Sequence, residues 1–378
     1  MYPYSLVLGV SHQITRKWGH VHTESNASTL PSLVENVSLP PNGQISRHQP
    51  PTKTTGRSKP FLRIAQRVHD SETLFPLMVA AFKAMQKIGI NVTPNHFYWP
   101  IPDIAYLEKR KWPEKDMPAG LDLRMPEQIR LLEACAAKYA SEWAFPDHPV
   151  DGLVYHYNNG LFETVDSEIA YSIVRHFSPS RVIEVGGGYS TRVLAAALRK
   201  NFNESGMRGE LITVDPYCDP ALSSISTIIR KPVQDVEVDL FLSLRENDVL
   251  FIDSSHVISV GSDAVFEYLE ILPRLHKGVV VHAHDIFMPS DYPREPVLKN
   301  MCFWSEQYML QSFLSLNPSF EVLWGSSAMQ AFHSDVLEEY FPRWSQNYSA
   351  IPRDKRRFVP TIDGKRSWPS SFWMRRIA

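Results

Sequence analysis

Residues 181–191 read Arg-Val-Ile-Glu-Val-Gly-Gly-Gly-Tyr-Ser-Thr, and this segment is the clearest indication of the fold class. Its first five residues are mostly β-branched and apolar, which predicts a short strand at 181–185. Three glycines follow, and a helix is expected over 191–200. Glycines let a backbone approach a ligand closely, and a helix N-terminus offers free N–H groups. The unit therefore predicts a nucleotide-type βα turn, although a tight turn without ligand or a dinucleotide site would look alike.

Strand and helix alternate on both sides of this turn. A helix is expected near 169–177, and further helices at 264–272 and 306–316. Apolar runs predict strands at 211–214, 226–229, 249–252 and 278–282, and a closing strand pair at 320–323 and 329–332. Such alternation predicts an α/β fold, a doubly wound Rossmann-like sheet with helices on both faces and an antiparallel last strand.

Composition divides the rest of the chain. Residues 1–60 are rich in Ser, Thr, Asn, Pro and His, which predicts a disordered N-terminal tail. Residues 61–150 are expected to form a helical cap, with helices at 74–88 and 126–139 and an aromatic extended loop at 95–103. The α/β domain is assigned to 151–335, and 336–378 to a C-terminal extension.

The overall composition is that of a globular protein. Of 378 residues, 43% are hydrophobic and 21% charged, and the net charge of −2 argues against nucleic acid or acidic lipid as a partner. The three cysteines suggest no disulfide framework and favour a reducing compartment. No run approaches the roughly 20 apolar residues that cross a bilayer. The sequence thus predicts a cytoplasmic enzyme and leaves its oligomeric state open.

Two carboxylates frame the glycine turn. Glu184 precedes Gly186 by two residues, where an acid would sit poorly beside a pyrophosphate but would suit a ligand with a cationic group. The spacing also departs from G-x-G-x-x-G, because Thr191 stands at the third glycine position. Asp215 follows the strand at 211–214, where a carboxylate can accept hydrogen bonds from ribose hydroxyls. Nicotinamide-binding folds share this second feature, so it does not discriminate.

These motifs resemble those of the class I S-adenosylmethionine-dependent methyltransferases. The closest resemblance is to a bacterial subfamily with an E-x-G-x-G-x-S-T turn, an I-D-x-x-H strand end and an H-D-I-F-x-P loop, which read here as 184–191, 252–256 and 284–289. It covers roughly residues 61–335, and Gly187 departs from it where the subfamily often has a small polar residue. The resemblance implies S-adenosylmethionine as cofactor and methyl transfer to a small molecule, most often at a hydroxyl oxygen. The cofactor-binding residues that it implies are Glu184, Gly186, Gly188, Ser190, Thr191, Asp215, Gln234 and Asp253.

Further polar residues follow two adjacent strands of the predicted sheet. Asp253 ends the strand at 249–252, and His284 and Asp285 follow the next strand, so all three are expected at the ligand edge of the sheet. Related enzymes of the catechol and macrolide-sugar type hold Mg²⁺ with an Asp and an acidic or acid-amide pair at these positions. Asp253, His284 and Asp285 are therefore candidate ligands of a divalent metal such as Mg²⁺.

A metal-free interpretation stays open. His256 or His284 could act as a general base, with Asp285 beside it, and His256 stands where catechol-type enzymes carry a basic catalytic residue. Either histidine could instead be a hydrogen-bonded structural residue. His282, inside the strand, is expected in the core.

Two segments are candidates for a lid over this edge, 95–103 and 288–300. The aromatic side chains in these segments, which would stack on a substrate or simply pack the lid, are Tyr98, Trp99 and Tyr292. The same region contains Trp304, Glu306 and Gln307, and the sequence does not indicate which of these three is functional. Two other functions remain open: a nicotinamide-dependent oxidoreductase, which Glu184 argues against, and a methyltransferase-like scaffold without chemistry.

Overall fold

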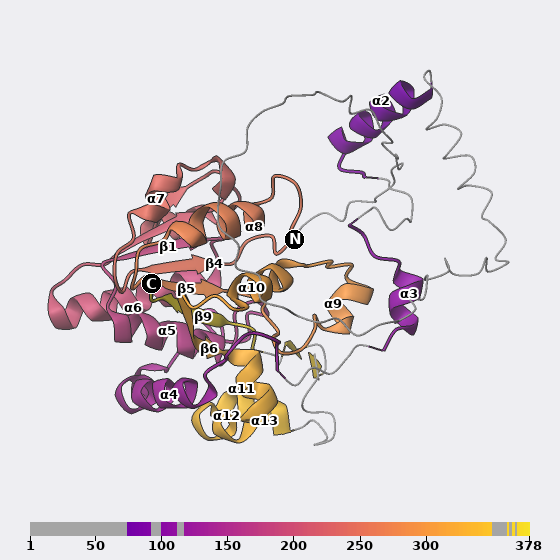
Figure 1. The fold of residues 1–378 in the computed structure, drawn as a ribbon. Helices are drawn as coiled ribbons and strands as arrows, with labels where there is room; N and C mark the ends of the chain where they lie inside the picture. Colours follow the sequence, from indigo (N-terminus) through magenta and orange to yellow (C-terminus); the bar gives the residue numbers. More distant parts are fainter. Residues whose placement is uncertain (1–73, 92–99, 112–116, 350–360, 363–364, 367–368) are drawn as a thin grey trace, which may run out of the picture. The chain divides into compact units, whose positions relative to one another are not determined.

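The computed structural model describes residues 74–91, 100–111, 117–349, 361–362, 365–366 and 369–378 (Figure 1). The chain divides after Asp103 into two compact units. In the first unit, helix α2 (Leu74–Lys87) confirms the predicted helix and carries Pro76 in its first turn. The predicted tail at 1–60 and the residues Tyr98 and Trp99 lie outside the described ranges.

The second unit is built on a seven-stranded sheet with the order β3-β2-β1-β4-β5-β9-β6 (Figure 1). Strands β1 to β5 pair in parallel, and β9 runs antiparallel between β5 and β6. The bounds are β1 Arg181–Val185, β2 Glu210–Val214, β3 Thr227–Ile229, β4 Val249–Ile252, β5 Val280–Ala283, β6 Phe320–Gly325 and β9 Phe372–Arg376, with a separate two-stranded sheet of β7 Thr361–Ile362 and β8 Lys365–Arg366. The sheet confirms the predicted doubly wound fold with an antiparallel strand.

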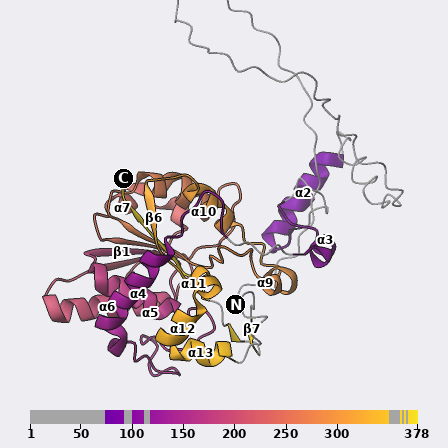
Figure 2. The ribbon, with the colours of Figure 1, turned by 60° about the horizontal axis from the view of Figure 1, so that its bottom comes forward.

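Helices cover both faces of this sheet, as Figures 1 and 2 show, and each face has its own apolar core. Successive side chains of a strand point to opposite faces, so Val182 packs in one core and Ile183 in the other. The helices are α3 Ile104–Lys109, α4 Met125–Tyr139, α5 Asp166–Phe177, α6 Tyr189–Ser205, α7 Val238–Leu242, α8 Asp263–Phe266, α9 Arg294–Lys299, α10 Glu306–Leu314, α11 Ser326–Phe332, α12 Ser334–Tyr340 and α13 Pro342–Ser349. No helix in the described ranges is long and apolar enough to cross a membrane.

The closing strand pair was predicted wrongly in one half. The residues at 329–332 belong to helix α11, and β6 pairs instead with β9 near the C-terminus. A strand between β5 and β6 is covered on both faces and needs consecutive apolar residues. Phe372, Trp373 and Met374 supply them, and all three are buried. Residues assigned to a C-terminal extension therefore complete the sheet.

Two helices also differ from their predicted form or place. The helix expected at 264–272 is regular only in α8, and continues as a π-helical turn over Glu267–Ile271. Helix α4, expected in the cap, packs on the sheet domain, where Gln128 accepts a hydrogen bond from the backbone N–H of Gly325 at 2.8 Å. The domain boundaries proposed from composition remain predictions.

Candidate active site

The turn between β1 and α6 contains three glycines with different reasons for lacking a side chain. Gly186 has φ of +85°, and a Cβ there would overlap the backbone oxygen of Asp253. A Cβ on Gly187 would lie 2.8 Å from the Thr213 side chain. A Cβ on Gly188 would meet nothing within 4 Å, and its φ of −170° suits any residue. The fold therefore requires Gly186, whereas Gly188 leaves free space that a ligand could approach.

Glu184 lies beneath this turn with a fully buried side chain. Its carboxylate accepts hydrogen bonds from the hydroxyls of Ser190 and Thr191, both at 2.7 Å, and of Thr213 at 2.8 Å. Burial raises the pKa of Glu184 to about 7, and the three hydroxyl donors oppose this rise. The carboxylate thus anchors the start of α6, and its predicted contact with a cationic ligand group stays a prediction.

Asp215 lies directly after β2 and faces the same turn. Its Oδ2 accepts a hydrogen bond from the backbone N–H of Gly187 at 2.9 Å, and its Oδ1 accepts one from Tyr217 at 2.6 Å. The side chain is only half-buried, so its oxygens can accept further bonds from ribose hydroxyls. Gln234, also predicted to contact the cofactor, is exposed, and its amide lies 3.5 Å from the Gly261 carbonyl oxygen.

The strand ends of β4 and β5 bring ionisable side chains together around His256. Its Nδ1 lies 2.8 Å from Glu306 Oε2, and its Nε2 lies 3.4 Å from Asp253 Oδ1 and 3.7 Å from Asp285 Oδ2. The ring is buried, whereas 30% of the Asp253 side chain is exposed. The region also adjoins the glycine turn, because the N–H of Asp253 donates to Val185 at 2.9 Å.

Electrostatic interactions within this group shift the pKa values of His256 and Asp253 in opposite directions. Burial disfavours the imidazolium of His256, but contacts with Asp253 and Glu306 outweigh burial and raise its pKa well above its ordinary range. Burial likewise raises the pKa of Asp253, but the nearby His284 and His256 outweigh it and lower that pKa to about 2. His256 is therefore a strengthened base whose charged form is favoured in this structure.

The predicted metal ligands do not fit a metal. Asp253 Oδ1 and Asp285 Oδ2 lie 3.4 and 3.7 Å from His256 Nε2, so an imidazole nitrogen already adjoins both carboxylates. His284 Nε2 lies 4.0 Å from Asp285 Oδ1. Within the described ranges, no three His, Cys, Asp or Glu side chains are grouped as metal ligands.

The other two histidines stack beside this group. His284 is buried, with its ring 5.2 Å from that of Phe162 and 5.6 Å from that of His282, and its Nδ1 has no partner among the described residues. His282 lies in the core as predicted, and burial lowers its pKa well below the ordinary value. Its Nε2 contacts Ser371 Oγ at 3.0 Å. Neither ring is placed against Asp253 as His256 is.

The structure adds residues that sequence reasoning did not assign. Glu306, to which the sequence assigned no role, contacts His256 through one carboxylate oxygen. Its other oxygen accepts a hydrogen bond from Tyr268 at 2.8 Å. Ser370, just before β9, donates to Asp285 Oδ1 at 3.1 Å. Tyr292 is only 3% exposed and packs against Phe287 and Trp304, which favours the packing interpretation. The only feature of the sequence that could have pointed to Glu306 is its position as an acidic residue next to the apolar residues of α10.

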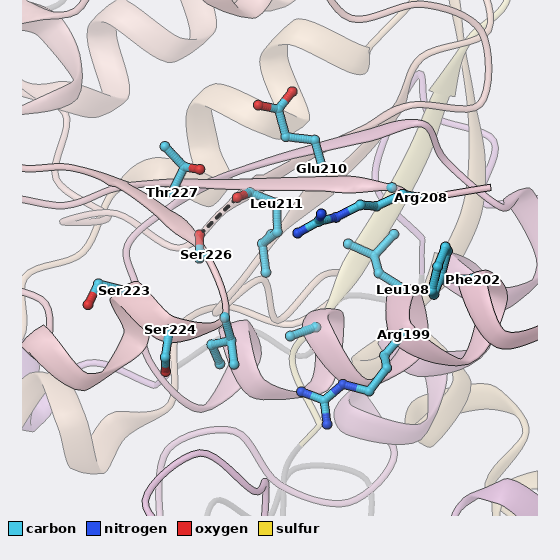
Figure 3. Close-up of a pocket in the computed structure, with 13 residues that line it drawn as sticks. Leu198, Arg199, Phe202, Arg208, Glu210, Leu211, Ser223, Ser224, Ser226 and Thr227 are labelled. Carbon is cyan, nitrogen blue, oxygen red and sulfur yellow. Dashed lines mark hydrogen bonds between the residues drawn. The ribbon is translucent and has the colours of Figure 1, made fainter. Parts of the chain in front are cut away.

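A separate cavity of about 700 Å³ lies between α6 and the starts of β2 and β3 (Figure 3). Glu210, the first residue of β2, lines it, whereas Asp215 follows the other end of that strand. Arg199, Arg208 and several hydroxyl side chains also line it, but none of the predicted site residues does.

Known proteins resemble this chain in sequence and structure. Residues 183–286 match the model of a methyltransferase domain family. An uncharacterized protein from Archaeoglobus fulgidus is 30% identical over 177 residues, which cover 43% of this chain and 77% of that protein.

Three solved structures are also similar. A Podospora anserina methyltransferase bound to SAH has 14% identity and a TM-score of 0.33, and covers 72% of this chain and 93% of its own. An O-methyltransferase from Bacillus cereus in complex with SAH has 14% identity and a TM-score of 0.31, with coverages of 66% and 91%. An O-methyltransferase from Streptomyces achromogenes in complex with SAM has 12% identity and a TM-score of 0.32, with coverages of 72% and 95%.

Proposed function

Because this chain belongs to the class I S-adenosylmethionine-dependent methyltransferases, we propose that it methylates a hydroxyl oxygen of a small molecule at the carboxyl edge of β4 and β5. One observation carries the choice of oxygen. His256 lies at this edge with its Nε2 toward Asp253, the more accessible of the two carboxylates near that nitrogen. A hydroxyl is a poor nucleophile until it loses its proton, and a positioned imidazole can accept that proton.

The residues of the glycine turn fit the cofactor. The bound cofactor supplies a methyl group made electrophilic by its sulfonium. The free space at Gly188 admits it close to the backbone, and the half-buried Asp215 offers carboxylate oxygens to ribose hydroxyls. Glu184 keeps Ser190 and Thr191 in place at the start of α6. These residues orient the donor, and alignment of donor and acceptor supplies a large part of the rate.

His256 handles the proton in this proposal. Nε2 of His256 would accept the proton that the acceptor hydroxyl loses when its oxygen takes the methyl group from the cofactor. Asp253 and Asp285, whose carboxylates lie 3.4 and 3.7 Å from this nitrogen, stabilise the imidazolium that forms. The raised pKa of His256 makes it a stronger base, and its charged form must lose a proton before each turnover. We therefore expect the rate to increase with pH from the acid side.

The setting of the reaction is part of the proposal. The net charge of −2 supports an uncharged or modestly charged small molecule over nucleic acid as the acceptor. Cys135 and Cys218 form no disulfide within the described part of the chain, which supports the reducing cytoplasm as the compartment.

The test uses methyl-labelled S-adenosylmethionine and a metabolite extract, with and without the enzyme. Wild type should transfer label to one or a few metabolites as an oxygen-bound methyl group. His256→Asn should lower the rate by roughly 10²- to 10⁴-fold, the usual contribution of a general base, while calorimetry shows unchanged cofactor binding. His276→Asn, at an exposed histidine before β5, is the matched control and should keep full activity. Label found on nitrogen or carbon, or full activity of His256→Asn, would contradict the proposal.

A further inference from the structure

We propose that Glu306 is a positioning residue for methyl transfer: it holds the His256 ring so that Nδ1 carries a proton and Nε2 faces the acceptor. The inference deepens the proposed function and rests on it. Glu306 comes 50 residues after His256 in sequence, on a different element, and the two side chains meet at 2.8 Å.

The backbone of His256 is tied to the start of helix α10. His256 has φ of +61°, a conformation that is uncommon for a residue other than glycine and costs about 1 kcal/mol or more. Its carbonyl oxygen accepts hydrogen bonds from the backbone N–H groups of Ser305 at 2.8 Å and Glu306 at 3.1 Å. These two bonds fix the peptide of His256 against α10, which places the imidazole next to the Glu306 side chain.

The side chain of Glu306 is held from both ends. It is fully buried, with Oε2 on His256 Nδ1 and Oε1 accepting the Tyr268 hydroxyl at 2.8 Å. Tyr268 is itself buried, so its hydroxyl cannot readily exchange this partner for water. The Trp304 ring packs in a T-shaped arrangement with the imidazole, with ring centres 5.4 Å apart. The carboxylate therefore has one arrangement available, and the imidazole is fixed with it.

This arrangement determines which ring nitrogen is free to react. An ionised carboxylate only accepts hydrogen bonds, so Nδ1 of His256 must donate and must carry a proton. In the neutral ring the other nitrogen, Nε2, is then the acceptor, and it lies toward Asp253 and Asp285. An orienting acid of this kind selects the tautomer of a catalytic imidazole without touching the substrate. Glu306 would act in this way through His256.

Glu267 provides a matched comparison within the same region. It is also fully buried, but it contacts Ser254 at 3.0 Å and not His256. Burial and the nearby Glu306 raise its pKa well above the ordinary value, which favours its neutral form. Glu267→Gln should therefore preserve both fold and activity. A general loss of structure from changing a buried acid would affect Glu267 and Glu306 alike, whereas positioning would affect Glu306 alone.

The experiment combines a ring N–H signal with kinetics on full-length protein. Protein with ¹⁵N-labelled histidine should show a hydrogen-bonded Nδ1–H of His256, assigned by its loss in His256→Asn. Glu306→Gln, whose amide oxygen can accept, should keep the signal, and Glu306→Leu should lose it. With labelled cofactor and the metabolite extract, Glu306→Leu should lower the maximal rate by roughly 10- to 100-fold, part of the contribution of a general base. Glu306→Gln and Tyr268→Phe should fall between it and wild type, and the KM for S-adenosylmethionine should not change.

Two outcomes would overturn the inference. One is an Nδ1–H signal of His256 that survives in Glu306→Leu. The other is a folded Glu306→Leu protein whose maximal rate is within twofold of wild type, or whose loss of rate is matched by Glu267→Gln. Failure of the proposed function is distinct: wild type would methylate no hydroxyl, while the N–H signal, measured without acceptor, would still report on Glu306.

Discussion

The glycine turn after β1 and the ionisable group after β4 and β5 each contain a carboxylate at the carboxyl edge of the parallel strands, and the pKa values of the two are shifted in opposite directions. Burial raises the pKa of Glu184 to about 7, because its partners are three neutral hydroxyls. Asp253 also experiences burial, but the nearby His284 and His256 lower its pKa to about 2. The charge of the partners, more than burial, thus decides whether a carboxylate here anchors the backbone or shares charge with a base.

The largest loss of stability should come from Gly186→Ala, because this change affects both the glycine turn and the backbone at Asp253. The new Cβ would sit at φ of +85° and overlap the backbone oxygen of Asp253. Strain and overlap together should lower the free energy of unfolding by about 3–5 kcal/mol. Urea unfolding measures this loss, and calorimetry should show that binding of S-adenosylmethionine is lost as well. An unchanged unfolding midpoint would mean that the two regions are not in contact as described.

Glu184→Gln should have a smaller effect that depends on pH. A carboxyl whose folded pKa is raised stabilises the fold below its ordinary value of 4.5, and this contribution is lost as pH rises through about 7. The difference corresponds to roughly 3 kcal/mol. Relative to wild type, Glu184→Gln should therefore gain stability between pH 4.5 and pH 8, as measured by urea unfolding at each pH. The exposed Glu339→Gln is the control, and a gap between Glu184→Gln and wild type that stays constant with pH would contradict the assignment.

Most of the glycine turn could be predicted from the sequence, but few of the contacts in the ionisable group could. Glu184, Gly186 and Thr191 lie within eight residues, so the spacing along one strand and helix is enough to place them together. The strand ends at Asp253 and Asp285 also follow from the order of parallel strands. Local periodicity therefore predicts the parallel strands β1 to β5 and the glycine turn, but not strand β9.

The remaining contacts depend on elements that pack only in the folded chain. Glu306 reaches His256 from α10, and Ser370 reaches Asp285 from the segment before β9. Strand β9 itself was missed because its five residues follow a long interval after β6, and the nearer apolar run at 329–332 was assigned to the sheet instead. Neither partner choice is encoded in residue spacing, so the histidine with the carboxylate contacts could not be chosen from sequence.

Asp253→Asn should lower the free energy of unfolding mainly at neutral pH, whereas the Glu184 carboxyl stabilises the fold mainly at acid pH. A carboxyl with a lowered folded pKa stabilises the fold above its ordinary value of 3.8, and the contribution is lost as pH falls toward about 2. Since 30% of the Asp253 side chain is exposed, solvent screening reduces the expected effect to about 1–2 kcal/mol. Urea unfolding should show this deficit at pH 6 and a narrower gap at pH 3. A deficit that is as large at pH 3 as at pH 6 would show that the histidines do not stabilise this carboxylate.

Gly188→Ala should have the smallest effect on stability and separates ligand binding from folding within one turn. A Cβ at Gly188 meets no protein atom within 4 Å and its backbone is extended, so the unfolding midpoint should match wild type. If the cofactor approaches the backbone here, the methyl group should weaken S-adenosylmethionine binding by about tenfold, or roughly 1.4 kcal/mol. Calorimetry on Gly188→Ala, with Gly186→Ala as the destabilised counterpart, measures this directly. Full affinity in Gly188→Ala would place the cofactor away from this residue. The presence of glycine at position 188 would then have to be explained by something other than ligand binding.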